Sequence, residues 1–329
     1  MKVLLIDTSY LIYRSYFAFP NLTHNDQPVG AFFGFAKGVL SLVKEYQPDE
    51  LVFACDTPDP TWRHQMYDGY KAGRTAIEPN MVAQFPIIKQ FAQSITQNYY
   101  EQAGWEADDF IHTIAKEANA DSQIMVFSAD KDLYQLFQYP NTEMIHAKKF
   151  GGFETFTREN FIAKYELQPL QWIDYKSLVG DNSDNLPGIP GIGPKTATKI
   201  LKEVGCIANL TEALNLGPFD FNHVEGDHNT QKFISNEKNF SLIEKIVTNL
   251  ESLQQTYKLA GLSTIPETKF SKTGFNIHNS LDLVEEYGFK SIATMINKLN
   301  QKPQDKPEKV QLEPELKPEN SPKDDGALF

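Results

Sequence analysis

The sequence predicts an α/β protein, in which a mainly parallel sheet flanked by helices is followed by a smaller helical unit. Short apolar runs rich in β-branched and aromatic residues alternate with helical patterns, which is typical of strand–helix–strand units. Farther along, the closely spaced glycines 188, 191 and 193 open into a helix that carries lysines. We therefore expect a sheet domain first and a helical domain after it.

The strands and helices expected for the sheet domain follow one another along the first half of the chain. Strands are expected at Val3–Asp7, Leu51–Asp56 and Ile124–Ser128, with weaker ones near Asn98–Glu101 and Glu143–His146. Helical patterns occupy roughly residues 30–46, 80–96 and 107–118.

Composition is that of an ordinary soluble protein, with 41% hydrophobic and 22% charged residues in a chain of 329. That length is sufficient for two domains with their own cores. The apolar run at the start is too short for a signal peptide or a membrane span. Two cysteines, Cys55 and Cys206, exclude a disulfide framework and fit a reducing cytosol.

Acidic residues mark the ends of the expected strands and the starts of helices. Asp7 ends the first strand, Asp56 the second, and Asp130 and Asp132 follow the fourth. Because ligands of parallel sheets bind at the carboxyl ends of the strands, we expect these side chains on one rim. The full set is Asp7, Asp56, Glu106, Asp108, Asp109, Asp130, Asp132, Asp181 and Asp184. One group at a helix start would be explained by the helix dipole, but four groups on one rim indicate a function.

Crowded carboxylates repel one another unless cations compensate them. An all-oxygen ligand set favours Mg²⁺ or Mn²⁺ over Zn²⁺. Two such ions about 4 Å apart would activate a water and stabilise the leaving oxygen of a phosphoryl displacement. Although the net charge is −12, bound divalent ions reverse the local field. The acids therefore predict a metal-dependent nuclease.

Between Asp56 and residue 80, cationic side chains alternate with aromatic ones. They are Arg63, Lys71 and Arg74 with Trp62, Tyr67 and Tyr70. Cations can bind phosphates while aromatic rings stack on unpaired bases. A solvated loop would explain any one of them, but the set beside the acids predicts a substrate clamp. Arg14, one or two helical turns beyond Asp7, could also reach a phosphate.

The glycine-rich turn predicts a contact with a nucleic-acid backbone. Its glycines let the main chain approach a ligand closely, and Pro194 suits the first turn of a helix, whose free N–H groups favour phosphate. Lys195 and Lys199 lie one helical turn apart and would face the same strand. A P-loop is rejected because Pro194 separates the last glycine from Lys195 and no strand pattern precedes the turn.

Taken together, five stretches resemble the bacterial 5′-nuclease family, which includes 5′–3′ exonucleases, flap endonucleases and the N-terminal domain of DNA polymerase I. The stretches are DTSYLIYRSYFAF, FACDTPDPTWRHQMYDGYKAGR, WEADDF, SADKDLYQL and LVGDNSDNLPGIPGIGPKTA. They occur in the order of the family and cover roughly residues 1 to 290. DTS and SADKD depart from the more usual DG or DA and TGDKD, but both keep every carboxylate.

The resemblance implies a PIN-like α/β nuclease domain at residues 1–172, with an arch at about 60–95. It implies a helix–three-turn–helix DNA-binding domain at 173–296. From residue 297 the chain is rich in Pro, Glu and Lys, which predicts a disordered tail. Since a polymerase I would continue for hundreds of residues, we expect a free-standing, monomeric, cytoplasmic enzyme that acts at the bacterial nucleoid.

Site residues also follow from the resemblance. Asp7, Asp56, Glu106 and Asp108 match the first metal site of the family, and Asp109, Asp130, Asp132, Asp181 and Asp184 match the second. Lys71 and Arg74 match arch residues that position the scissile phosphate, with Arg63 at the arch base. Gly188, Ile189, Gly191 and Gly193 match a turn that holds a potassium ion against the downstream duplex, and Lys195 and Lys199 match its phosphate contacts.

The expected function is a metal-dependent 5′–3′ exonuclease and 5′-flap endonuclease that removes flaps and RNA primers in replication and repair. Two alternatives are a DNA junction-binding module that does not cut, and a PIN-type nuclease that acts on RNA. The intact carboxylate set disfavours the first, and the helix–three-turn–helix signature disfavours the second. The final Leu328 and Phe329 resemble peptides that dock into the bacterial sliding clamp, although the usual glutamine is missing.

Overall fold

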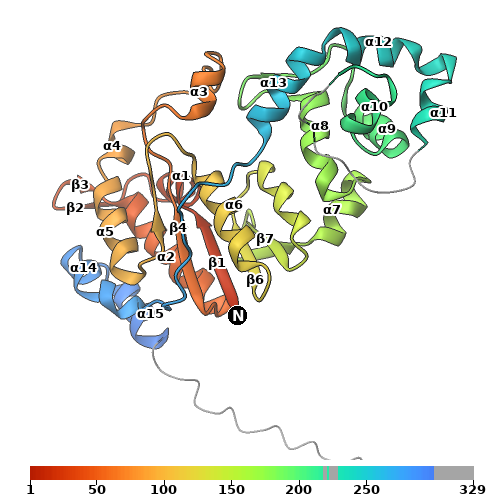
Figure 1. The fold of residues 1–329 in the computed structure, drawn as a ribbon. Coiled ribbons are helices and arrows are strands. Elements are labelled where there is room, and N and C mark those ends of the chain that lie inside the picture. The colour runs from red at the N-terminus through yellow and green to blue at the C-terminus, as the bar shows by residue number, and fades with distance from the viewer. Residues whose placement is uncertain (218–220, 222–228, 300–329) are drawn as a thin grey trace, which may run out of the picture.

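The computed structural model describes residues 1–217, 221 and 229–299. A six-stranded sheet forms the centre of its first part, in the order β5-β4-β1-β6-β7-β8 (Figure 1). The strands are β1 Lys2–Asp7, β4 Glu50–Ala54, β5 Tyr99–Tyr100, β6 Gln123–Phe127, β7 Thr142–Ala147 and β8 Phe153–Phe156. All neighbours pair in parallel except β7 and β8. The predicted mainly parallel sheet is confirmed.

Both faces of the sheet are covered, because alternate residues of each buried strand point to opposite sides. Leu4 and Ile6 of β1 pack in one core, and Val3 and Leu5 in the other. The first core includes α1 Thr8–Ala18, α2 Gly30–Tyr46 and α5 Phe85–Ile95; the second includes α6 Ala107–Ala118 and η1 Asp132–Gln138.

The helix expected at 80–96 is in fact two helices, α4 Pro79–Val82 and α5. Pro86, in the first turn of α5, has no N–H to donate to Val82, so the chain cannot continue one helix through this point. Shorter elements complete the first part: β2 Thr23–His24, β3 Gln27–Pro28 and α3 Trp62–Met66.

Helices dominate the second part, which lies beside the sheet domain (Figure 1). They are α7 Arg158–Tyr165, η2 Pro169–Gln171, α8 Trp172–Val179, α9 Pro194–Val204, α10 Ile207–Ala213, α11 Thr230–Ile234, η3 Glu237–Asn239, α12 Phe240–Thr248 and α13 Leu250–Ala260. A short hairpin of β9 Gly180–Asp181 and β10 Leu186–Pro187 separates α8 from α9. A two-residue strand thus precedes Gly188, where the sequence showed no strand pattern. Since it pairs antiparallel with β9, it does not make the turn a P-loop.

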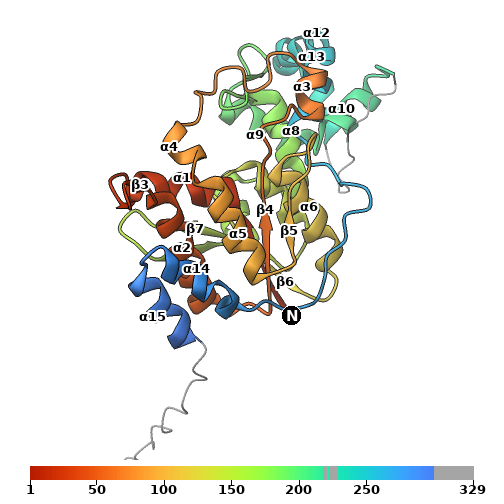
Figure 2. The same cartoon turned by 90° about the vertical axis from the view of Figure 1, so that its left-hand side faces the viewer.

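After α13 the chain returns to the sheet domain. The N–H of Ile265 donates to Thr113 Oγ1 at 2.9 Å, and that of Gly274 to Glu50 Oε1 at 2.8 Å. The last helices, η4 Ile277–Ser280, α14 Leu281–Glu286 and α15 Lys290–Leu299, belong to the core that contains α2 and α5 (Figure 2). The predicted domain boundaries stay a prediction, but these helices lie against the first domain.

Among the described residues, no helix is long and apolar enough to cross a membrane. The disordered tail was predicted from residue 297, but residues 297–299 belong to α15. The rest of the predicted tail, with Leu328 and Phe329, lies outside the described residues, as do residues 218–220 and 222–228 of the segment 215–229, which has no functional account.

Candidate active site

Carboxylates gather at the carboxyl end of the sheet, as the sequence predicts. Asp7, the last residue of β1, accepts the Tyr10 N–H on Oδ1 at 3.0 Å and the Ser128 hydroxyl on Oδ2 at 2.7 Å. Asp56, just beyond β4, accepts the N–H of Ala107 at 2.9 Å. These bonds join the ends of β1 and β6 and fix the start of α6 beside β4.

Four of the carboxylates, Asp7, Asp56, Asp108 and Asp130, form what we call the uncompensated group. Burial and the charges of Asp56 and Asp130 raise the pKa of Asp7 to about 7, although two hydrogen bonds oppose the shift. Burial, followed by the charges of Asp130, Asp7 and Asp56, raises the pKa of Asp108 well above its usual value. Within the described part of the chain, none of the four is in an ion pair.

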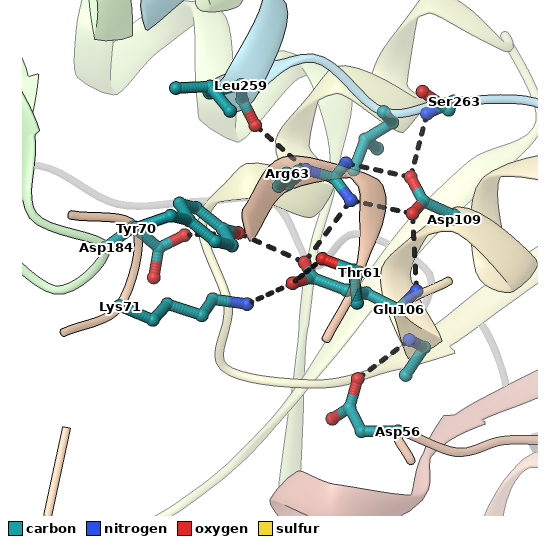
Figure 3. Close-up of polar contacts among 12 residues, drawn as sticks. Asp56, Thr61, Arg63, Tyr70, Lys71, Glu106, Asp109, Asp184, Leu259 and Ser263 are labelled. Atoms are coloured by element: carbon teal, nitrogen blue, oxygen red, sulfur yellow. Dashed lines mark hydrogen bonds and ion pairs between the residues drawn. The ribbon is translucent and has the colours of Figure 1, made fainter. Parts of the chain in front are cut away.

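The remaining rim carboxylates, Glu106, Asp132, Asp181 and Asp184, form what we call the paired group. Glu106 and Asp184 are held by the arch. Lys71 Nζ lies 2.9 Å from Glu106 Oε1, and Arg74 Nη2 lies 2.9 Å from Asp184 Oδ1. Between them, the Tyr70 hydroxyl is 3.1 Å from Glu106 Oε2 and 3.2 Å from Asp184 Oδ2 (Figure 3).

Asp132 and Asp181 share a cation that the sequence reasoning missed. The ammonium of Lys176 forms ion pairs with both carboxylates. Burial opposes its charge, but the charge of Asp132 and the hydrogen bonds that the ammonium donates to both acids outweigh burial and raise the pKa of Lys176. A signal was present in the sequence: Lys176 lies in the apolar stretch WIDYKSLV, which forms α8, five residues before Asp181.

Asp109, the ninth predicted acid, is joined to Glu106 by Arg63, whose Nη1 lies 2.7 Å from Asp109 Oδ2 and 3.4 Å from Glu106 Oε2. Both oxygens of Asp109 accept hydrogen bonds from Arg63, at 2.7 and 2.8 Å, and Oδ1 also accepts the Ser263 N–H at 2.9 Å (Figure 3). Arg63 is only 2% exposed and also donates to the carbonyl of Leu259 at 2.9 Å. This pair therefore fastens α3 and α6 to the end of α13. Arg63, predicted as a DNA contact, is not displayed to a ligand because its charge is satisfied inside the protein.

Of the cations and aromatic rings predicted as a substrate clamp in the arch, Arg74 is exposed, Lys71 is partly buried and Arg63 is buried. Tyr70 is 3% exposed and Tyr67 is partly buried against it, so Tyr70 is not free to stack on a base as predicted. Lys71 adopts a φ of 54°, a left-handed conformation rare for a residue with a side chain. Its backbone N–H donates to the carbonyl of Asp184 at 3.0 Å, which docks the arch on the hairpin before α9. Arg14 is exposed on α1 and donates to the carbonyl of Lys148 at 3.1 Å.

The glycine-rich turn has the close packing that its glycines predict. A Cβ on Gly188 would lie 2.2 Å from the carbonyl oxygen of Val179, so no larger residue fits there. Gly191 has a φ of 79°, which strongly favours glycine. Ile189 is buried and its N–H donates to Leu178 at 2.9 Å. Gly193 caps α9, Pro194 follows in its first turn, and Lys195 and Lys199 are exposed on it.

Within the described residues, no three acidic, histidine or cysteine side chains already converge closely enough to hold a metal ion. The uncompensated group nevertheless fits divalent cations. Its donors are all carboxylate oxygens, which suit Mg²⁺ or Mn²⁺. Burial and then the neighbouring carboxylates raise the pKa values of Asp7 and Asp108, so their charged forms would be stabilised by a bound cation.

Comparison with known proteins places this site in a family. The model of the 5′–3′ exonuclease N-terminal, resolvase-like domain matches residues 2–166, and that of the 5′–3′ exonuclease C-terminal SAM fold matches residues 167–277. The chain belongs to the 5′–3′ exonuclease family. A 5′–3′ exonuclease of Bacillus subtilis is 30% identical over 311 residues, which span 91% of this chain and 97% of the relative.

Other relatives in the family are longer. DNA polymerase I of Bacillus subtilis is 33% identical over 294 residues, which cover 88% of this chain but 32% of the polymerase. The chain thus spans about a third of that relative. Among solved structures, the bacteriophage T5 flap endonuclease in a complex with DNA and metal ions has a TM-score of 0.60 at 17% identity, over 91% of this chain and 98% of the other. The catalytic core of Rad2 with a DNA substrate has a TM-score of 0.54 at 17% identity, over 87% and 86%. At these identities the likeness shows the fold.

Proposed function

We propose that the chain is a metal-dependent 5′-nuclease that hydrolyses DNA phosphodiesters at free 5′ ends and at the base of 5′ flaps. The single observation that carries this proposal is the uncompensated group of carboxylates at the carboxyl end of the sheet. Family membership supports the reaction class, and the RNA primers and displaced flaps of replication and repair are the substrates we expect.

The uncompensated group would hold one divalent cation, and the paired group would contribute ligands for a second. When bound, such ions supply a water activated at neutral pH and stabilise charge on the phosphate oxygens. Asp109 would not bind these ions itself. It would help to position the carboxylates at the start of α6, because it holds Arg63 there. This departs from the ligand role that the family resemblance gives it.

Arch cations would orient the scissile phosphate. Lys71 and Arg74 project from a loop docked on Asp184, and both already lie within 3 Å of a rim carboxylate. A phosphate that enters beside them can accept hydrogen bonds from the ammonium and the guanidinium. Arg14, exposed on α1, is the third cation that we assign to the substrate strand.

Duplex DNA would bind at the start of α9. Lys195 and Lys199 are exposed there, and the first N–H groups of the helix favour a phosphate. We propose that carbonyls of the turn from Gly188 to Gly193 hold a potassium ion against the same backbone. The close packing at Gly188 supports a main-chain role for this turn.

Cleavage of a 5′-labelled flap on a nicked duplex tests the proposal. We expect cutting near the junction in Mg²⁺, none in EDTA, and loss of cutting in Asp130→Asn. Asp121→Asn, which changes a surface aspartate paired with Lys272, is the matched control and stays active. Tight flap binding without cutting in any divalent metal would instead support a junction-binding module, and preference for a matched RNA flap would support an RNA nuclease.

The C-terminal Leu328 and Phe329 are proposed to tether the enzyme to the sliding clamp, with a monomeric enzyme acting in the bacterial cytoplasm. Their support is the sequence alone. Deletion of both residues should weaken recovery of the purified clamp in a pull-down without changing flap cleavage. Unchanged recovery would exclude the tether.

A further inference from the structure

Lys176 lies on the paired half of the rim, where a second divalent cation would need ligands. Its side chain is 10% exposed, and its ammonium contacts Asp132 Oδ1 and Asp181 Oδ2. Among the described residues, that oxygen of Asp132 is buried and has no hydrogen-bond partner besides this ammonium. The ammonium is therefore its principal interaction.

The position of Lys176 is fixed by the elements around it. One turn earlier on α8, the indole N–H of Trp172 donates to the carbonyl of Lys131 at 2.7 Å, next to Asp132. Asp181 follows α8 directly in β9, where Ser183 donates a backbone N–H to its other oxygen at 2.7 Å. The lysine and both carboxylates are thus held together by α8, η1 and β9 rather than by a chance surface contact.

Charge and space make the ammonium and a divalent cation competitors. Both are attracted to the same two carboxylate oxygens, and like charges a few ångströms apart repel strongly where water is largely excluded. A lysine side chain has four rotatable bonds, so its ammonium can move aside while α8 stays in place.

We propose that Lys176 is a built-in counter-ion, whose ammonium holds Asp132 and Asp181 together until a second divalent cation displaces it. This inference rests on the proposed metal-dependent function. It assigns Lys176 a positioning role: the lysine keeps the metal-free rim folded and weakens binding of the second cation. The first cation, bound by the uncompensated group, meets no such competitor.

Titration with Mn²⁺ in the absence of DNA, followed by the electron paramagnetic resonance of the free ion, tests this role. In wild type we expect one stronger and one weaker class of Mn²⁺ site. Lys176→Met should tighten the weaker class by about tenfold or more, because a like charge is removed, and leave the stronger class unchanged. The same variant should melt at a lower temperature in EDTA and gain more from Mn²⁺ than wild type does.

Three further variants make the result specific. Lys176→Arg keeps the charge and should retain weak second binding. Lys176→Gln also removes the charge but can still donate hydrogen bonds to both acids. It should therefore tighten the weaker class as well, and it replaces Lys176→Met if that variant does not fold. Lys272→Met removes a lysine paired with Asp121 far from the rim and should change neither class.

Two failures are distinguishable. An unchanged weaker class in both Lys176→Met and Lys176→Gln, with the stronger class intact, would overturn the counter-ion role alone. Absence of any Mn²⁺ binding in wild type would overturn the proposed metal-dependent function and this inference with it.

Discussion

The two carboxylate groups on the rim use the same residue type in opposite ways. In the uncompensated group, burial and mutual repulsion raise the pKa values of Asp7 and Asp108. In the paired group, burial raises the pKa of Asp181, but hydrogen bonds from Lys176 and Ser183 outweigh it and leave the pKa below its usual value. Asp132 of the same group differs, because burial and the charge of Asp130 outweigh the attraction of Lys176 and raise its pKa to about 7. What separates the two groups is therefore the presence of ion-pair partners, since each member of the paired group contacts a lysine or an arginine.

The largest effect should come from removing one charge from each group in turn. Asp108→Asn should lower flap cleavage by about a thousandfold, or about 4 kcal/mol in activation free energy, because a carboxylate of the metal site is lost. In EDTA, however, it should raise the melting temperature, because an amide at this position carries no charge for Asp7, Asp56 and Asp130 to repel.

Asp181→Asn should do the opposite to metal-free stability. It leaves Lys176 with one carboxylate instead of two, so the melting temperature in EDTA should fall. Both variants are measured by the same thermal melt beside the cleavage assay. If both shifted the metal-free melting temperature in the same direction, the distinction between the two groups would fail.

Removal of the ion pair between Arg63 and Asp109 should lower the free energy of unfolding, whether or not metal ions are bound. Arg63→Met leaves Asp109 buried and unpaired, which typically costs about 3–5 kcal/mol. We expect that loss in urea unfolding with and without Mg²⁺ alike. Arg158→Met, at the start of α7, is the control and should leave the midpoint unchanged. A loss at Arg63 that Mg²⁺ restored would place Arg63 and Asp109 in the metal site instead.

Stability should fall as pH rises in metal-free protein, and the fall should continue above 6.5. Burial raises the pKa of Asp174 to about 8, and burial with neighbouring charges raises those of Asp7 and Asp132 to about 7. Because the folded state binds these protons more tightly than the unfolded chain, whose carboxyls titrate near 4, stability is lost from about pH 4 up to about pH 7 for Asp7 and Asp132 and up to about pH 8 for Asp174. His112 acts oppositely, since burial lowers its pKa to about 4, but its effect lies below pH 6.5.

Each such group lowers the free energy of unfolding by up to about 1.4 kcal/mol for each unit of pH rise below its folded-state pKa. Bound Mg²⁺ should remove the pH-dependent loss of stability caused by Asp7. The loss caused by Asp174 should persist, because this residue is buried in α8, where its Oδ1 accepts the Ile207 N–H. Asp174→Asn should abolish that persistent loss. Urea unfolding at pH 6.5 and 8.5 checks both, and a pH dependence that Mg²⁺ left unchanged in wild type would contradict the account.

The smallest effect concerns the exposed lysines of α9. Lys195→Gln should weaken duplex binding only a few-fold and reduce the slope of log K against log salt by about one, as expected for one lost phosphate contact. Lys290→Gln, on α15, is the matched surface control. Fluorescence anisotropy of a labelled flap duplex at several salt concentrations gives both quantities. An unchanged salt slope in Lys195→Gln would remove α9 from the DNA-binding surface.

Sequence reasoning predicted the features that depend on local pattern. Five of the six strands of the sheet, the acids at their ends and the turn at Gly188 follow from periodicity, strand-end position and backbone geometry. The antiparallel edge strand β8 was not predicted. What it missed depends on contacts distant in sequence. Arg63 reaches Asp109 and Leu259, which lie 46 and 196 residues away. Nothing local distinguishes such a buried arginine from a neighbouring one that binds DNA.

Lys176 was missed for a related reason. The lysines singled out from the sequence lie in the arch segment or the glycine-rich turn, whereas Lys176 lies on a helix face that packs against the rim. Its partners Asp132 and Asp181 were both predicted, but as metal ligands. The structure supplies the cation that occupies the space between them in the metal-free protein.

The most direct test of the contrast between the two groups is anomalous diffraction from crystals soaked at increasing Mn²⁺ concentration. At the lowest concentrations we expect a single peak among Asp7, Asp56, Asp108 and Asp130, with Lys176 still between Asp132 and Asp181. A second peak should appear beside that pair only at higher concentration, with the ammonium displaced. A first peak between Asp132 and Asp181 would contradict the account.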